Sequence, residues 1–253
     1  MIELVHLTKR YAGILAVDDL SLQVAAGEIF GFLGPNGAGK TTTIRMMMGL
    51  LQPSAGKIFL GGHDLEHEDI AAKQMCGFVP DRPHMYEKLT GAEFLDFVAG
   101  LYHVAPAVAA QRRDDLLEMF DLTRWATELV ESYSHGMKQR LVMAAAMIHA
   151  PRLLIVDEPM VGMDPRGAKL LKRTFRQLAR SGVTVFMSTH SLEVAEETCD
   201  RIGIIHQGQL IAVGSLDELR RQAGTHSHSK LESVFLKLTG GEDVAELLTA
   251  LRA

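Results

Sequence analysis

Short runs of apolar residues alternate with segments of helical spacing along most of the chain. Three of the runs, IFGFL (29–33), LLIVD (153–157) and VTVFM (183–187), are almost continuously apolar, as expected of parallel strands that are covered on both faces. Helical spacing is clear over 41–51 and over 167–180. Because parallel strands are joined by crossover connections that are usually helices, this alternation predicts an α/β fold with a mainly parallel sheet.

Two segments break the alternation. Residues 90–149 contain three successive helical patterns and no convincing strand, which predicts a helical subdomain inserted over about 82–149. After the polar stretch GTHSHS the helical spacing returns, so we expect a domain over 1–225 and a helical appendage over 226–253. No internal repeat is visible, which indicates one such domain and not two.

Composition narrows the class of protein. The 253 residues are 47% hydrophobic, and 26 basic residues face 31 acidic ones, so no basic excess suggests a nucleic-acid partner. No apolar run approaches the roughly 18 residues of a membrane span, and the N-terminal MIELVHLTKRY lacks the apolar core of a signal peptide. The two cysteines lie far apart, as expected of reduced residues in a cytosolic protein. We therefore expect a cytoplasmic protein that reaches a membrane only through a partner.

The strongest chemical signal is GPNGAGKT, residues 34–41, which lies between a predicted strand and a predicted helix. It matches G-x-x-x-x-G-K-[ST], in which glycines let successive N–H groups surround phosphates, the lysine reaches the outer phosphates and the last hydroxyl binds Mg²⁺. A glycine-rich turn that binds nothing is the structural alternative. The expected nucleotide-binding residues are Gly34, Pro35, Asn36, Gly37, Ala38, Gly39, Lys40, Thr41 and Thr42.

A second signal, LLIVDEP, argues against most kinases and GTPases. Its apolar residues deliver Asp157 and Glu158 to the carboxyl end of a strand, where open α/β sheets bind ligands. We expect Asp157 to hold Mg²⁺ through water and Glu158 to polarise a water molecule aimed at the γ-phosphate. The structural alternative is a helix cap followed by a solvated charge.

A third segment, ESYSHGMKQRL (131–141), places a small polar turn before a predicted helix. Free N–H groups at a helix start suit an anion, so the chain has a second phosphate-binding candidate at Ser134 and Gly136.

The order of GPNGAGKT, YSHGMKQRL, LLIVDEP, GMDP and STH resembles the nucleotide-binding subunit of ATP-binding cassette (ABC) transporters across nearly the whole chain. The resemblance implies ATP and Mg²⁺ as cofactors and a P-loop NTPase core with an N-terminal antiparallel β-subdomain. In that family two subunits pair head to tail, and the signature turn of each closes on the ATP of the other. Ser134 and the Gly136 N–H are therefore expected to bind the partner subunit's γ-phosphate.

Three further roles follow from the same resemblance. Tyr11 matches the aromatic residue that stacks on adenine, although an ordinary strand-edge tyrosine is the alternative. His190 matches the histidine that contacts the γ-phosphate and positions the attacking water; a core histidine is the alternative. Asp164 matches the loop that crosses the dimer interface, and it could also be a helix N-cap before Pro165. Lys40, Glu158 and His190 thus form the expected catalytic set.

Two motifs depart from the usual pattern. Asp81 stands where the family has a glutamine that contacts Mg²⁺, and we expect it to bind the ion through water. The signature reads Tyr133-Ser134-His135-Gly136-Met137 where Leu-Ser-Gly-Gly-Gln is commonest, so its serine and second glycine are kept.

The segments DRPHMYEKLTGAEFLDFVAGLY and LESVFLKLTGG resemble the exporter subgroup, in which a separate ATPase subunit drives a separate membrane subunit. The expected partners are a second ABC ATPase subunit, identical or paralogous, and an integral membrane permease. The expected location is the inner face of the cell membrane. We also expect residues 83–102 to help form the groove that receives a cytoplasmic helix of the permease. This segment is expected to expose Tyr86 and Leu89 ahead of a helix whose apolar side is Phe94, Leu95 and Val98. The apolar spacing from Val234 to Leu251 predicts a tail that docks.

Two alternatives remain at this point. One is a soluble ABC ATPase that acts on ribosomes or DNA; such proteins carry two cassettes or a long insertion and favour basic surfaces. The other is a catalytically impaired regulatory subunit, suggested by Asp81 and His135, although Lys40, Asp157, Glu158 and His190 are all present.

Overall fold

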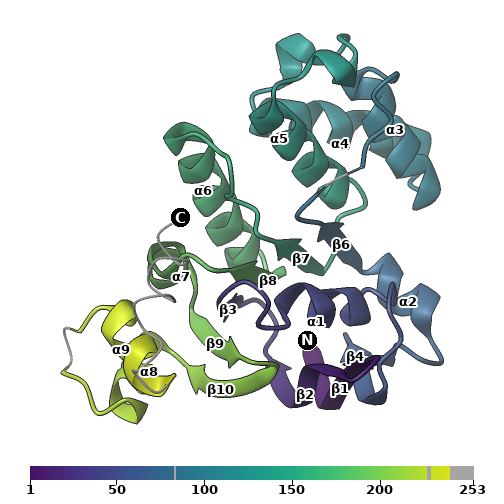
Figure 1. The fold of residues 1–253 in the computed structure, drawn as a ribbon. Helices are drawn as coiled ribbons and strands as arrows, with labels where there is room; N and C mark the ends of the chain where they lie inside the picture. The colour runs from purple at the N-terminus through teal and green to yellow at the C-terminus, as the bar shows by residue number, and fades with distance from the viewer. Residues whose placement is uncertain (83, 227–228, 240–253) are drawn as a thin grey trace.

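The computed structural model describes residues 1–82, 84–226 and 229–239, which form two sheets with covering helices and a separate helical block (Figure 1). The strands are β1 (Ile2–Tyr11), β2 (Ile14–Val24), β3 (Ile29–Leu33), β4 (Ala55–Leu60), β5 (His63–Asp64), β6 (Cys76–Val79), β7 (Leu153–Asp157), β8 (Thr184–Thr189), β9 (Arg201–His206) and β10 (Gln209–Gly214). The α-helices are α1 (Lys40–Met47), α2 (Asp69–Gln74), α3 (Gly91–Leu101), α4 (Pro106–Met119), α5 (His135–Met147), α6 (Pro165–Arg180), α7 (Leu192–Thr198), α8 (Leu216–Gln222) and α9 (Leu231–Leu238). Two short 3₁₀ segments lie at Thr123–Trp125 and Val130–Ser132.

The larger sheet has the strand order β10-β9-β3-β8-β7-β6. Its strands run parallel from β9 to β6, and only β10 is antiparallel. Every residue of β3, β7 and β8 is buried, which explains why their sequences lack alternation. The predicted α/β class is therefore confirmed. Because β3 and β7 run parallel with β8 between them, the loops after β3 and β7 emerge at the same edge of the sheet.

The smaller sheet, ordered β2-β1-β4-β5, is antiparallel throughout and contains the alternating segment LSLQV within β2. Its apolar side chains share a core with those beneath α1. This arrangement confirms the antiparallel N-terminal β-subdomain.

Helices α3, α4 and α5 form the helical block, which lies beyond β6 and apart from α1 (Figure 1). Its interior contains Leu95, Phe120 and Leu141, all fully buried. Thr90 and Glu93 form a reciprocal capping box that fixes the start of α3. No helix in the described part of the chain is long and apolar enough to cross a bilayer.

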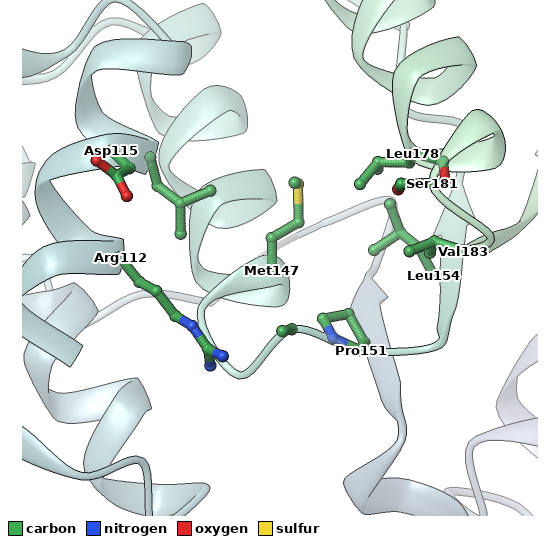
Figure 2. A pocket seen from close by; sticks show the side chains of 10 residues that line it. Arg112, Asp115, Met147, Pro151, Leu154, Leu178, Ser181 and Val183 are labelled. Atoms are coloured by element: carbon green, nitrogen blue, oxygen red, sulfur yellow. Dashed lines mark hydrogen bonds between the residues drawn. The ribbon is translucent and has the colours of Figure 1, made fainter. Parts of the chain in front are cut away.

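The join between the helical block and the sheet is packed on one side and hollow on another. The ring of Tyr102 stacks on that of His149 with centroids 3.7 Å apart, and the His149 Nε2–H donates to the Cys76 carbonyl at 3.1 Å. A cavity of about 320 Å³ lies between α4, the loop before β7 and the end of α6 (Figure 2). Arg112 lines it from the α4 side and donates to the Ile148 carbonyl at 3.2 Å.

Helix α1 ends at Met47, so the expected helix over 41–51 is too long by one turn. The Leu50 N–H bonds to the Arg45 carbonyl and the Gly49 N–H to the Met46 carbonyl, while Gly49 has a φ of 64°. These bonds form a Schellman motif, in which a left-handed glycine ends the helix.

Helix α9 packs against the body of the protein through Leu231, Val234 and Phe235, which are all fully buried. They share an apolar cluster with Leu33 and Leu219. The expected docking of the tail is thus seen for the described part, whereas the other apolar positions used in that prediction (Val244, Leu247, Leu248 and Leu251) lie outside the described residues.

Replacing Phe235 with Ala should lower the free energy of unfolding by about 3–5 kcal/mol, because the ring is fully buried in a closed apolar cluster. Chemical denaturation is the measurement. Lys237→Ala on the same helix is the control and should change stability by less than about 0.5 kcal/mol. Equal stability of the Phe235→Ala variant and the natural protein would contradict the packing of α9.

The His149 ring gives a pH-dependent contribution to stability. Burial lowers the pKa of His149 to about 4, and the nearby charge of Arg112 acts in the same direction. Since the unfolded chain binds the proton at a higher pH than the folded chain, stability should fall as the pH drops from about 6.5 towards 4. His149→Phe keeps a flat ring on Tyr102 without a titrating group, so its unfolding free energy should vary less over that range. Identical pH profiles would contradict a neutral buried His149.

Candidate nucleotide-binding site

The loop between β3 and α1 has a backbone that only glycine can adopt at its tightest point. Gly39 has a φ of 106°, and a Cβ placed there would lie 2.5 Å from the Ala16 carbonyl oxygen. The close approach of β2 therefore holds the loop in place at the start of α1. The free N–H groups of this helix start face the pocket described below.

Lys40 is only 6% exposed, and its ammonium group is surrounded by oxygen atoms. Nζ donates to the carbonyls of Gly34 at 2.6 Å and Pro35 at 3.1 Å, and it lies 3.4 Å from Glu158 Oε1. Burial lowers the pKa of Lys40, whereas the charge and hydrogen bond of Glu158 raise it. The lysine is thus held inside the loop and not extended into solvent.

A pocket of about 350 Å³ opens beside this loop and brings together residues from five parts of the chain. Nine of the expected site residues line it: Asn36, Gly37, Gly39, Lys40, Thr41, Thr42, Asp81, Glu158 and His190. Ala16 and Val161 also line it and were not expected from the sequence. Gly34 and Pro35 contribute to the site through the carbonyls that hold Lys40.

Asp157 lies at the end of β7 with 2% exposure. Its carboxylate accepts a hydrogen bond from the Ser188 hydroxyl. Burial raises the pKa of Asp157, and the neighbouring hydroxyls of Ser188 and Thr41 oppose that effect. Thr41, Asp157 and the half-exposed Asp81 together offer oxygen atoms only, which is the donor set that Mg²⁺ prefers.

Glu158 adopts a φ of 51°, a left-handed conformation that costs a non-glycine residue about 1–3 kcal/mol. Its N–H points back to Ser188, whose Oγ lies at 3.1 Å and whose carbonyl lies at 3.3 Å. This turn directs the Glu158 carboxylate between Lys40 and His190. Oε2 lies 3.0 Å from the His190 Nδ1 and accepts from the His190 backbone N–H at 3.4 Å.

Ser134 and Gly136 do not line this pocket, and they lie at the start of α5 in the helical block (Figure 1). The Ser134 hydroxyl accepts from the Met137 N–H at 3.3 Å as the N-cap of α5. A Cβ at Gly136 would meet no atom within 4 Å, so the space in front of this turn is open. Neither Ser134 nor Gly136 is therefore part of the pocket of its own chain.

Asp164 also lies outside the pocket and caps α6, where Oδ1 accepts from the Gly167 N–H at 2.9 Å. Within a single chain, Asp164 therefore acts as the N-cap of α6. The loop before it touches the signature turn, because a Cβ on Gly162 would lie 3.1 Å from His135 Nε2.

Tyr11 ends β1 and is 41% exposed. The ammonium of Lys9 lies 5.2 Å from the centre of its ring. Tyr11 is not among the residues that line the pocket, but its ring is accessible for stacking.

Comparison with known proteins decides the family. Residues 17–161 match the family described as ABC transporter, which is more than half of the chain. The chain belongs to the ABC transporter ATP-binding family. It is therefore an ATP-binding subunit with the P-loop NTPase fold.

Several relatives of this ABC subunit are named for resistance or transport. It is 41% identical to the daunorubicin resistance ATP-binding protein DrrA3 of Streptomyces coeruleorubidus over 85% of this chain and 68% of the relative. It is 41% identical to the linearmycin resistance ATP-binding protein LnrL of Bacillus subtilis over 88% of this chain and 72% of the relative. The bacitracin transport ATP-binding protein BcrA of Bacillus licheniformis is 39% identical over 88% of this chain and 72% of the relative.

Solved structures agree with the fold of this ABC subunit. An ATP-binding subunit of an ABC transporter superposes with a TM-score of 0.89 at 33% identity, covering 94% of this chain and 99% of that one. A dimeric ATP-binding cassette in a post-hydrolysis state with ADP and phosphate superposes with a TM-score of 0.77 at 24% identity, over 85% and 99%. The second likeness concerns the fold alone.

Sequence reasoning overlooked Ser188, which contacts both Asp157 and Glu158. A signal was available, since Ser188 is a polar residue at the end of the apolar run VTVFM, immediately before the Thr-His pair. Ala16 and Val161 gave no comparable signal because both are ordinary apolar residues outside any motif.

Proposed function

We propose that this ABC subunit hydrolyses Mg·ATP and that the hydrolysis powers export by a separate membrane subunit. The observation that carries the proposal is the position of the Glu158 carboxylate, which lies between Lys40 and His190 in the pocket beside the P-loop. A buried carboxylate with those neighbours can accept a proton from water at the phosphate end of a bound nucleotide. The assembled set also argues against a catalytically impaired subunit.

The chain's own residues would divide the work as follows. The P-loop N–H groups and Thr42 hold the phosphates, and Lys40 exchanges its carbonyl partners for β- and γ-phosphate oxygens. Thr41, Asp157 and Asp81 would hold Mg²⁺, which neutralises charge on the β- and γ-phosphates when bound. Tyr11 stacks on the adenine ring.

In the hydrolytic step, Glu158 takes a proton from water as the water oxygen bonds to the γ-phosphorus. The bond from that phosphorus to the bridging oxygen breaks, and ADP leaves with the electron pair. His190 orients the water and the γ-phosphate, and its contact with Oε2 keeps the carboxylate aimed at the same point.

The active unit in this proposal contains two copies of the subunit or one copy and a paralogue. The Ser134 hydroxyl and the Gly136 N–H bind the γ-phosphate held by the partner subunit's P-loop, and Asp164 lies at the interface. Support comes from the open space in front of Gly136 and from the absence of both signature residues among those that line their own chain's pocket. The N-terminus of α5 adds a favourable partial charge for an anion.

A groove beside the helical block is the proposed contact with the membrane subunit. A cavity of about 400 Å³ lies between the end of α1, β6 and α3, lined by apolar side chains that include Leu50, Phe78, Phe94 and Val98. Leu95, on the same apolar side of α3, is fully buried inside the helical block and does not line the groove. Tyr86 is 62% exposed and packs edge-on against Phe97 at 5.1 Å. An amphipathic helix of a permease fits such a groove.

The relatives named for drug resistance and bacitracin transport support the export role and the placement of this subunit at the inner membrane face. They also favour a transporter over an ATPase that acts on ribosomes or DNA.

Replacing Glu158 with Gln should lower the rate of ATP hydrolysis by about 10²-fold or more while Mg·ATP still binds, because the amide cannot accept the proton. Because ATP is retained, two subunits of this variant should remain paired. Light scattering measures the pairing, with the permease added where isolated subunits pair too weakly. Adding Ser134→Arg to the same chain should abolish that pairing and leave the ATP affinity of the monomer nearly unchanged.

Ser132→Arg is a matched control two residues away, outside the proposed phosphate contacts, and should preserve the ATP-dependent dimer. Loss of monomer ATP binding in a folded Ser134→Arg variant would show that the signature acts within its own chain. An undiminished hydrolysis rate in Glu158→Gln would exclude Glu158 as the base.

A cysteine at position 86 should cross-link to a cytoplasmic helix of the co-purified permease, because Tyr86 is exposed and contacts Phe97 on α3, the helix that lines the proposed groove. Mass spectrometry of the cross-linked product identifies the contact. A cysteine at Ile14, which is exposed in the β-subdomain, is the control and should not cross-link. Cross-linking from position 14 but not from position 86 would show that the permease contacts the β-subdomain and not the proposed groove.

A further inference from the structure

Ser188 lies at the centre of the carboxylate-bearing edge of the larger sheet. It is the penultimate residue of β8, it is fully buried, and the parallel register pairs it with Asp157. The preceding residues of β8 from Val185 to Met187 are apolar. A hydroxyl at this place needs buried partners, since an unpaired buried polar group costs free energy.

The hydroxyl of Ser188 has two such partners. It donates its single hydrogen to Asp157 Oδ1, and it accepts the Glu158 N–H at 3.1 Å. A serine hydroxyl offers one donor and two acceptor positions, so both bonds can exist at once. One side chain therefore contacts both acidic residues of the LLIVDEP motif.

The two contacts have different consequences for the site. The first fixes the Asp157 carboxylate at the end of β7, beside the pocket that Thr41 lines. The second supports the left-handed backbone of Glu158, whose side chain would point elsewhere if φ relaxed to a negative value. The Ser188 carbonyl also accepts the Glu158 N–H at 3.3 Å, so the hydroxyl supplies only part of this support.

We propose that Ser188 is a positioning residue for ATP hydrolysis: its hydroxyl orients Asp157 towards Mg²⁺ and holds Glu158 in the conformation that places its carboxylate beside Lys40 and His190. The inference rests on the proposed function. Ser188 does not line the nucleotide pocket, so it acts through these two residues and not on the substrate. It should therefore affect turnover and metal binding more than nucleotide binding.

The test compares Ser188→Ala with the natural protein and Ser188→Val with Ser188→Thr. Valine and threonine have nearly the same shape, and both add a methyl group to the serine side chain. The difference in activity between these two variants therefore isolates the effect of the hydroxyl, even if the methyl group disturbs the buried site. Thr184→Val is the control, because Thr184 is an equally buried hydroxyl of β8 that accepts the Gly27 N–H at 2.9 Å, far along the strand from Asp157. Thermal unfolding establishes that each variant is folded.

Residues that orient metal ligands commonly change affinity or activity by about 10–100-fold when they are replaced. We expect kcat to fall about tenfold or more in Ser188→Ala, and in Ser188→Val relative to Ser188→Thr, with the KM for ATP changed less than about threefold. Mn²⁺ binding to the ADP-loaded subunit, followed by electron paramagnetic resonance, should weaken in the same variants. Thr184→Val should lower the melting temperature and leave kcat and Mn²⁺ binding unchanged.

Normal kcat and Mn²⁺ binding in folded Ser188→Ala would overturn the inference, as would equal losses in Ser188→Ala and Thr184→Val. Either result leaves the proposed function standing, because the natural protein would still hydrolyse ATP. The absence of ATP hydrolysis by the natural protein in complex with its permease would instead overturn the proposed function, and with it the role of Ser188.

Discussion

The buried pairing of Lys40 with Glu158 is the contact on which the rest of the site depends. An ammonium group removed from water costs several kcal/mol unless oxygen atoms surround it. Here two loop carbonyls and a carboxylate supply those oxygens. The carbonyls come from the loop after β3 and the carboxylate from the end of β7, and these strands are not neighbours. Only the parallel order β3-β8-β7 brings the two loops to one edge.

Lys40 at that edge can bind a group that is more negative than the loop carbonyls. Phosphate oxygens are stronger partners for Lys40, because charge-assisted hydrogen bonds exceed those to neutral carbonyls. The hydrogen bond from the Glu158 N–H to Ser188 supports a backbone φ of 51° at Glu158, so the Glu158 carboxylate has a second support besides Lys40. The signature turn begins α5 of the helical block, and its Ser134 and Gly136 do not line the pocket at this edge. In the proposed mechanism a second subunit therefore supplies the signature turn.

Several features could be predicted from sequence because they depend on local patterns. Continuous apolar runs identified β3, β7 and β8, and glycine spacing identified the P-loop. Other features could not be predicted, because they depend on turn geometry and tertiary packing that local patterns do not show. The end of α1 was placed a turn too late, since apolar methionines continue the helical spacing past the Schellman turn at Gly49. The apolar spacing of α3 also did not separate Leu95, which belongs to the core of the helical block, from Phe94 and Val98, which line the groove.

The sequence by itself determined the class of the fold, the nucleotide and the order of the motifs, because a P-loop and a strand that ends in two carboxylates are encoded by adjacent residues. The tertiary structure alone decided which of those residues meet. The contact of Glu158 with Lys40 and His190, and that of Ser188 with Asp157 and Glu158, all join residues that are 30 or more positions apart. Strand order and register create these contacts, and neither property is written in any single segment of the chain.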